Sequence, residues 1–302
     1  MAGKGTIFIP SFYTDKTSDP VDIGEFKCTL VGAHYKCLSN ALESDQYCQL
    51  IRCQPKTDSR TILWSCTAVG TLATTNDSRD EQSVFHFWST SFGNGFTDFH
   101  AHFDASTFRK TAFDYKGRIF VEVVDSFIAD LSQPNNPLIT CSEDAVKLKI
   151  DGEELWVTKK NLAFHTHFFN VLFTGDFKEK SDDCYELKDI KLGDFLMLLG
   201  IVHNLTMIID ENIVEDLLKL ADFFRCKIVL DRCEEYIKNA PVKCLPLHKK
   251  LQLAEKFKLR STLTDIIAKA PLDKLKKISW EGDFSAFARS LMFLKFRVIS
   301  FC

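Results

Sequence analysis

Residues 144–173 read DAVKLKIDGEELWVTKKNLAFHTHFFNVLF, and this stretch decides the fold of the second half of the chain. Within it, residues 146–150 alternate apolar and charged side chains, Gly152 follows, and a second apolar run occupies residues 155–157. An alternation of period two that is interrupted at a glycine is typical of two strands joined by a tight turn. The stretch therefore predicts a β-hairpin.

The residues after the hairpin predict one helix over 159–173, ended by Gly175. Its apolar side chains cover an arc of about 200°, whereas a surface helix needs little more than about 100°. His165 lies inside the apolar arc and His167 on the polar side, so two imidazoles roughly 160° apart cannot share one metal ion. We expect a buried, hydrogen-bonded His165 and a helix covered both by its own domain and by a partner.

Downstream, residues 184–190 (CYELKDI) predict another short strand, and a series of apolar-periodic stretches predicts helices. The helical stretches are FLMLLGIVHNL (195–205), NIVEDLLKLADFF (212–224), CKIVLDRCEEYI (226–237), LHKKLQLAEKFKL (247–259) and LTDIIAKA (263–270). Leu220-Ala221 and Leu253-Ala254 each precede an aromatic residue and a break that starts a second helix. The echo predicts a repeated helical hairpin rather than a solenoid.

The first half of the chain carries short runs of β-branched and aromatic residues, bounded by turn formers. The clearest runs are FKCTLVGAHYKCL (26–38), TILWSCTAVGTLATT (61–75), SVFHFWST (83–90) and RIFVEVVDSF (118–127). On the third run, Val84, His86 and Trp88 share one face while Phe85 and Phe87 share the other, so both faces are bulky. Because no helical pattern interrupts the series, we expect an antiparallel β-sandwich.

Composition narrows the class of protein. The chain has 302 residues, 45% of them hydrophobic, which is enough for two domains with real cores. We found neither a signal peptide nor a membrane span, so a cytoplasmic or nuclear protein that is not secreted is expected, with the 11 cysteines as reduced thiols. The net charge of −3 does not favour nucleic acid, although residues 241–302 hold 13 Lys and Arg against 5 Asp and Glu. A solvated helical face is the favoured reading of this basic tail, and nucleic-acid binding through 269–277 is the alternative.

Motifs for chemistry are absent from the sequence. It contains no Gly-x-Gly-x-x-Gly, P-loop, Gly-x-Ser-x-Gly or His-Glu-x-x-His pattern. His100 and His102 could face the same side of a strand, but no cysteine or acid is placed to complete a metal site, so surface histidines are favoured. FGNGF (92–96) is interpreted as a turn. We expect no enzyme, no cofactor, no metal site and no membrane contact.

Residues 144–152, 155–162 and 165–173 together resemble the start of a BTB/POZ domain. The resemblance continues, in the same order and over about 100 residues, through YELKDI (185–190), FLMLL (195–199), VEDLLKLADFF (214–224) and CEEY (233–236). The segment LQLAEKFKL (251–259) is similar to the helical extension that often follows this domain. Such domains are commonly dimeric and hold a cullin, which predicts a homodimer and a cullin scaffold as partners.

The first half resembles a MATH domain through Trp64-Ser-Cys66, GFTDF (95–99) and FVEVV (120–124). The two halves together resemble the MATH–BTB class, in a form similar to the expanded nematode families. Members of this class are commonly substrate adaptors of cullin-RING ubiquitin ligases. The resemblance implies a fold with an N-terminal antiparallel sandwich, an α/β BTB/POZ domain and a C-terminal helical extension.

Candidate interaction residues follow from the resemblance. The dimer interface is predicted at Asn161, Leu162, His165 and Phe169; the cullin-facing set at Leu192, Asp194, Leu196 and Leu199; and the substrate groove at Trp88, Asn94 and Phe96. The chain departs from the family at Asn94, where an aromatic residue is common, and at Asn161, where an apolar one is common. Its hydrophobic-x-acid motif is Leu192-Gly193-Asp194, with a shorter acid than usual. The three leucines are expected to form an exposed apolar set, with a core role as the alternative.

The predicted domains are a MATH-like sandwich over 1–133, a linker over 134–141, a BTB/POZ domain over 142–240, and a helical extension with a basic tail over 241–302. Two functions remain open. One is a dimeric ubiquitin-ligase adaptor that holds an unknown protein substrate. The other is a dimerising scaffold without a ligase role.

Overall fold

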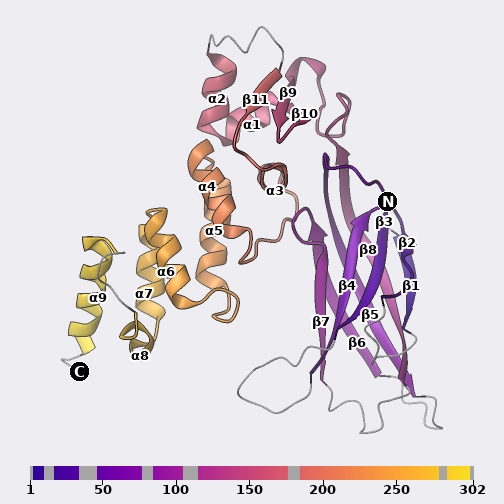
Figure 1. Cartoon of the computed structure of the whole chain (residues 1–302), viewed down its shortest axis with the longest axis horizontal. Helices are drawn as coiled ribbons and strands as arrows, with labels where there is room; N and C mark the ends of the chain where they lie inside the picture. The colour runs from indigo at the N-terminus through magenta and orange to yellow at the C-terminus, as the bar shows by residue number, and fades with distance from the viewer. Residues whose placement is uncertain are drawn as a thin grey trace. The chain divides into compact units, whose positions relative to one another are not determined.

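The computed structural model describes residues 3–9, 17–33, 46–76, 84–104, 115–175, 184–278 and 284–299 (Figure 1). The chain divides into two compact units. The first contains Met1–Thr158 and Glu179–Ile208, and the second contains Lys159–Lys178 and Ile209–Cys302. Each unit is described by itself.

Two antiparallel sheets form a sandwich in the first unit, as the strand pattern predicted (Figure 1). One sheet has the order β1-β8-β5-β6 and the other the order β2-β3-β4-β7. Their strands are β1 (Gly3–Ile9), β2 (Val21–Ile23), β3 (Phe26–Ala33), β4 (Gln46–Pro55), β5 (Ile62–Asn76), β6 (Val84–Gly93), β7 (Asp98–Asp104) and β8 (Tyr115–Asp130). The four predicted strands correspond to β3, β5, β6 and β8, while β1, β2, β4 and β7 were missed.

The sandwich core lies between the two sheets and is filled by alternate residues of each strand. Phe26 from one sheet and Trp64 from the other pack with ring centroids 5.7 Å apart. Cys28, Cys53 and Cys66 lie in the same core as free thiols, with the Cys53 and Cys66 sulfur atoms 3.8 Å apart. Hydrogen bonding to Cys28 and Cys66, together with burial, raises the pKa of Cys53 far above its ordinary value. Its thiol therefore stays protonated and packs as a small hydrophobe.

The hairpin predicted from the opening stretch is confirmed as β9 (Ala145–Ile150) and β10 (Glu153–Thr158). Asp151 and Gly152 both have positive φ, at 51° and 83°, as a two-residue turn with the right twist requires. The predicted strand β11 (Cys184–Leu187) pairs in parallel with β9, which gives the sheet order β10-β9-β11. Helix α3 (Leu192–Val202) follows β11 in the same unit.

Residues 131–141 connect the sandwich to this hairpin and are hydrogen-bonded to it. Asn136 is buried and donates a hydrogen bond to the Trp156 carbonyl at 3.0 Å. The Trp156 amide in turn donates to the Leu131 carbonyl at 2.7 Å. Arg60 of the sandwich also forms a 2.7 Å ion pair with Asp151 in the hairpin turn. The predicted linker is thus an ordered series of turns.

The single helix predicted over 159–173 is wrong, because the chain breaks at Thr166. Helix α1 covers Lys159–His165 and helix α2 covers His167–Thr174. Thr166 is extended, with φ −133° and ψ 133°, and its hydroxyl accepts the amide hydrogen of Phe169 as an N-cap. The same hydroxyl donates to the Leu162 carbonyl. A helical wheel drawn through both helices therefore does not place His165 relative to His167.

The rest of the second unit is helical (Figure 1). Its helices are α4 (Val214–Phe224), α5 (Lys227–Asn239), α6 (Leu247–Lys256), α7 (Arg260–Lys269), α8 (Leu272–Leu275) and α9 (Ala286–Ile299), of which α8 and α9 were not predicted. The repeated hairpin is confirmed in detail. Arg225 and Lys258 both adopt positive φ after the first helix of each pair, at 50° and 56°. The amides that follow them donate to Ala221 and Ala254, 2.8 Å away in each case. Over the stretches that the structure describes, no helix has both the length and the apolar character needed to cross a membrane.

One charged cluster ties α4 to α6. Glu215 accepts hydrogen bonds from Lys249 at 2.6 Å and from Lys256 at 2.7 Å. These two lysines lower the pKa of the Glu215 carboxyl to about 2. The carboxylate thus favours the folded state while it is charged.

We expect Glu215→Gln to lower the free energy of unfolding of the helical unit by about 1–2 kcal/mol at neutral pH, since two charge-assisted hydrogen bonds are weakened on a partly exposed side chain. The folded pKa lies below the unfolded one, so the wild-type advantage is complete above about pH 5 and disappears as the pH falls toward 2. Urea unfolding followed by far-ultraviolet circular dichroism across this range measures the difference. Glu235→Gln, on the exposed side of α5, is the control; an equal loss in both variants, or a loss independent of pH, would contradict the prediction.

Candidate protein interaction site

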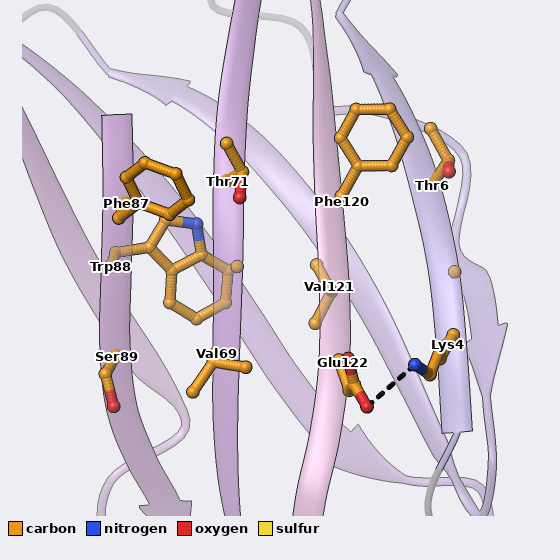
Figure 2. A pocket seen from close by; sticks show the side chains of 12 residues that line it. Lys4, Thr6, Val69, Thr71, Phe87, Trp88, Ser89, Phe120, Val121 and Glu122 are labelled. Carbon is orange, nitrogen blue, oxygen red and sulfur yellow. Dashed lines mark ion pairs between the residues drawn. The ribbon is translucent and has the colours of Figure 1, made fainter. Parts of the chain in front are cut away.

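A hollow of about 780 Å³ lies on the outer face of the β1-β8-β5-β6 sheet (Figure 2). It is lined by three consecutive residues from each of the four strands and by none from the other sheet. The lining residues are Lys4–Thr6, Val69–Thr71, Phe87–Ser89 and Phe120–Glu122. Because neighbouring residues of a strand point to opposite faces, only the first and third of each set direct side chains outward.

Two phenylalanines dominate the outer face of this hollow. Strand register places Thr6 beside Phe120, Phe120 beside Thr71, and Thr71 beside Phe87. Phe87 is 83% exposed and Phe120 is 45% exposed, and Figure 2 shows their rings on the strands that flank Thr71. With strands about 4.8 Å apart, the two aromatic positions stand about 10 Å from each other. An apolar side chain of a partner can enter between them, with the Thr71 methyl as its floor.

Charged groups border the aromatic row on the β1 side. Lys4 and Glu122 form a 2.9 Å ion pair across β1 and β8, drawn as a dashed line in Figure 2. On the opposite side of the Thr6–Phe120 pair from Lys4 and Glu122, the neighbouring strand pair is Phe8 with Arg118. The Arg118 guanidinium lies 5.5 Å from the ring centroid of the exposed Phe8. Lys4 and Arg118 are both exposed to solvent, so the ion pair with Glu122 and the contact with Phe8 contribute little to stability. An apolar centre with a polar rim is the usual anatomy of a protein interface.

Trp88 was predicted to line a substrate groove, and the structure turns its indole toward the sandwich interior. The ring packs on Phe99 of the other sheet, 5.7 Å between centroids, and lies against the backbone of Gly70. Its Nε1 is buried without a hydrogen-bond partner. Trp88 thus supports the β6 wall of the hollow from behind. Its role in a groove remains a prediction.

Asn94 closes the turn after β6. Its side-chain oxygen accepts the Trp64 amide hydrogen, and its side-chain nitrogen donates to the Ile62 carbonyl, both at 2.8 Å. Phe96 completes the turn by a reciprocal pair of 3.0 Å backbone bonds with Gly93, which confirms the turn predicted for FGNGF. Asn94 and Phe96 do not line the hollow, which lies about 20 Å back along β6 at an extended rise of about 3.3 Å per residue.

The turn after β6 also packs against α3. A side chain at Gly95, which has φ +78°, would meet the Met197 sulfur at 3.1 Å. The turn that holds Asn94 and Phe96 and the helix with the predicted cullin-facing residues are therefore neighbours in the first unit.

The leucines that were predicted to face a cullin are buried. Leu192 and Leu196 are 3% exposed and Leu199 is fully covered, so the expected exposed apolar set is wrong and the core alternative is correct. Helix α3 is apolar on nearly all sides, as a helix enclosed by its own fold must be. Asp194 stays partly exposed in the first turn, 3.9 Å from Lys191. Whether this surface holds a cullin remains a prediction.

The four predicted dimer residues lie on α1 and α2. Leu162 and Phe169 are fully covered within the single chain, while Asn161 and His165 are partly exposed. The expectation of a buried His165 is therefore wrong, and its ring meets Phe164 edge-on at 4.9 Å. Phe164 itself is 83% exposed, although the wheel placed it in the apolar arc. A dimer role for the four residues stays a prediction, and Phe164 is the most exposed apolar side chain beside them.

Metal-ligating side chains do not gather in the part of the chain that the structure describes. No cluster of three or more His, Cys, Asp or Glu residues there could hold a metal ion. His100 lies exposed on β7, and the side chain of His102 lies outside the described residues. The hollow itself is lined by neither histidine nor cysteine, and its lysine and carboxylate are paired to each other.

Comparison with known proteins relates both halves of the chain to known domains. Residues 142–240 match the BTB/POZ domain family model. BTB and MATH domain-containing protein 45 of Caenorhabditis elegans is 34% identical over 120 residues, which cover 40% of this chain and 25% of that protein. BTB and MATH domain-containing protein 36 of the same organism is 25% identical over 239 residues, 72% of this chain and 71% of that protein. Kelch-like protein 26 of Danio rerio is 28% identical over 141 residues, 46% of this chain and 23% of that protein.

The chain contains a BTB/POZ domain at residues 142–240. Over the described residues an antiparallel sandwich precedes this domain and further helices follow it, an order that is consistent with a MATH–BTB architecture. It spans between a quarter and a half of the length of three of the curated relatives that it matches, at 25%, 44% and 50%.

Proposed function

We propose that this chain is a protein-interaction adaptor, a substrate-recognition subunit of a cullin-RING ubiquitin ligase without catalytic activity of its own. In this proposal the BTB/POZ domain forms a homodimer and holds the cullin. The sandwich holds the protein substrate. The observation that carries the proposal is the outer hollow of the sandwich, where Phe87 and Phe120 are exposed on a sheet face with no chemistry-bearing cluster. Its support is the MATH–BTB architecture shared with the relatives.

The hollow also suggests the kind of substrate. Two phenyl faces about 10 Å apart accept an apolar side chain between them, and the charged rim at Lys4 and Glu122 can meet polar groups on either side. The open outer face fits an exposed loop or an extended segment better than a small molecule, which would need a more enclosed cavity.

A dimerising scaffold without a ligase role is the second candidate. The observation that favours it is the burial of Leu192, Leu196 and Leu199, which leaves Asp194 as the only one of the four predicted cullin-facing residues with an accessible side chain. An interface needs a buried apolar anchor as well as a polar rim. Both candidates predict a dimer, and only the first predicts a complex with a cullin.

The experiment is a pull-down of the N-terminal region of a cullin by the purified full chain, with light scattering on the same sample. We expect a dimer and a retained cullin fragment. A well-folded dimer that retains no cullin would refute the adaptor and leave the scaffold; a monomer without cullin would refute both.

The double variant Phe87→Ser with Phe120→Ser separates substrate binding by the sandwich from cullin binding by the BTB/POZ domain. Both side chains are exposed, so the fold and the cullin complex should be unchanged. For proteins whose ubiquitination in cells depends on the wild-type chain, the level of ubiquitination should fall at least tenfold with this variant. The exposed Phe293→Ser in α9 of the helical unit is the matched control on the substrate side. Equal modification by wild type and the double variant would show that the hollow does not hold the substrate.

A further inference from the structure

A second hollow, of about 350 Å³, lies in the helical unit where α5, α6, α7 and α8 meet. Its walls are mainly apolar and come from the loops between these helices as well as from the helices themselves. The apolar lining residues are Val242, Leu247, Ile266, Ala270 and Pro271. Val242 is 68% exposed at the mouth of this hollow. An open apolar depression of this kind is a place where a partner can bury side chains.

Lysines surround the apolar lining. Lys238, Lys250, Lys269 and Lys274 line the hollow against the single acid Asp265, which is 3.4 Å from Lys238. Lys250 donates a hydrogen bond to the Ala240 carbonyl and is largely buried. Lys269 and Lys274 are exposed, and neither has an ion-pair partner among the described residues. The hollow therefore keeps a positive potential that the residues described by the structure do not neutralise.

An adjoining hollow of about 440 Å³ extends the feature. The two share Leu247 and Lys274, and the second adds His248, Gln252, Lys277, Ile278 and Phe284. Together they form one groove with apolar and cationic lining residues, which we call the lysine groove. All of its lining residues except Lys238 belong to the segment 241–302, where Lys and Arg exceed Asp and Glu by eight.

We propose that the lysine groove binds an acidic segment of a partner protein, whose apolar side chains enter the groove while its carboxylates face Lys269 and Lys274. This site lies outside the sandwich hollow and outside the predicted cullin face, so it adds a further partner to the proposed adaptor. A second copy of the chain does not suit it, because like-charged lysines would be brought together. Nucleic acid suits it less than a peptide, because single strands need exposed rings for stacking. Phe284 is only 5% exposed, which leaves His248 as the one exposed ring among the lining residues.

The test uses two labelled pools of synthetic 15-residue peptides and the full chain. In one pool, Asp or Glu alternates with Leu, Val or Phe; in the other, Lys takes every acidic position. Fluorescence anisotropy at low salt should show binding of the acidic pool at least tenfold tighter than binding of the lysine pool. The affinity for the acidic pool should also fall as salt rises.

Two variants locate the binding. Lys269→Glu with Lys274→Glu should weaken binding of the acidic pool at least tenfold, because attraction is replaced by repulsion at the rim. Lys27→Glu with Lys188→Glu makes the same change in net charge at exposed sites of the other unit and should leave the affinity within twofold. Val242→Asp tests the apolar mouth and should weaken binding without affecting the fold, since this side chain is mostly exposed.

Several results would overturn the proposal. Equal binding of the two pools, or no binding of the acidic pool by a well-folded chain, would exclude a groove selective for acidic segments. If the two double variants lost affinity for the acidic pool equally, the binding would depend on net charge and not on the groove. A gel shift of single-stranded RNA that disappears with Lys269→Glu and Lys274→Glu, without peptide binding, would assign the groove to nucleic acid. A change of oligomeric state in this variant, without peptide binding, would assign it to a second copy.

Discussion

Phe169→Asp is expected to unfold the helical unit, at a cost of more than about 4 kcal/mol in the free energy of unfolding. The Phe169 ring is fully covered and stacks on Phe224 at 5.0 Å and on Phe173 at 5.5 Å between centroids. Phe168 meets it edge-on at 5.2 Å. Truncating such a ring alone costs about 3–5 kcal/mol, and an aspartate in its place adds a carboxylate with no cation to pair with in the aromatic contact. Far-ultraviolet circular dichroism during urea unfolding measures the loss.

The matched control lies five residues earlier in the same helix pair. Phe164 is 83% exposed, so Phe164→Asp should change the free energy of unfolding by no more than about 0.5 kcal/mol. Phe169→Leu, which keeps an apolar side chain, should fall between the two. If Phe169→Asp and Phe164→Asp were equally stable, the aromatic cluster would not be the core of this unit. If Phe164→Asp abolished the dimer while the chain stayed folded, the dimer interface would include the exposed ring of Phe164.

Local patterns predicted the elements well where neighbouring residues decide the structure. The hairpin at β9 and β10 needs only its own alternation and the turn at Asp151 and Gly152. The repeated helical hairpin was visible because a Leu-Ala pair, an aromatic residue and a break recur in the same order, and the structure adds an αL residue at the same place in both. The break at Thr166 was missed because a wheel counts apolar side chains and ignores the hydroxyl, which competes with the helix as an N-cap.

The candidate site could not be located in the same way, because it depends on pairings between distant segments. Phe87 and Phe120 are brought together only because β6 and β8 both pair with β5 around Thr71. The sequence did show that β6 is bulky on both faces, but it did not show which face meets the other sheet. The prediction therefore named Trp88, whose indole packs inward, and not the exposed Phe87 beside it. The expectation that Leu192, Leu196 and Leu199 are exposed was wrong for a related reason, since helical spacing alone does not show whether α3 is enclosed.

Gly70→Val is the second substitution with a large expected effect, a loss of about 3 kcal/mol or more in the stability of the sandwich. Gly70 lies in the middle of β5, where valine would ordinarily be favoured over glycine. A Cβ there, however, would overlap the Trp88 ring and lie only 2.5 Å from the Phe120 carbonyl oxygen. Neither a paired strand backbone nor an indole packed between two sheets can move aside cheaply, so overpacking outweighs β propensity. Urea unfolding followed by tryptophan fluorescence measures the change.

Two further variants separate crowding from a general glycine effect. Gly193→Ala, in the first turn of α3, meets nothing within 4 Å and should be neutral or stabilising by up to about 1 kcal/mol. Gly70→Ala with Trp88→Leu should recover part of the loss of Gly70→Ala alone, and a coupling of at least about 1 kcal/mol is expected because the two residues touch. The rescue is incomplete, since the Phe120 carbonyl remains in place. Additive effects would mean that the indole does not rest on Gly70. In that case Trp88 would be free to turn outward, and the hollow between Phe87 and Phe120 would lose the support behind its β6 wall.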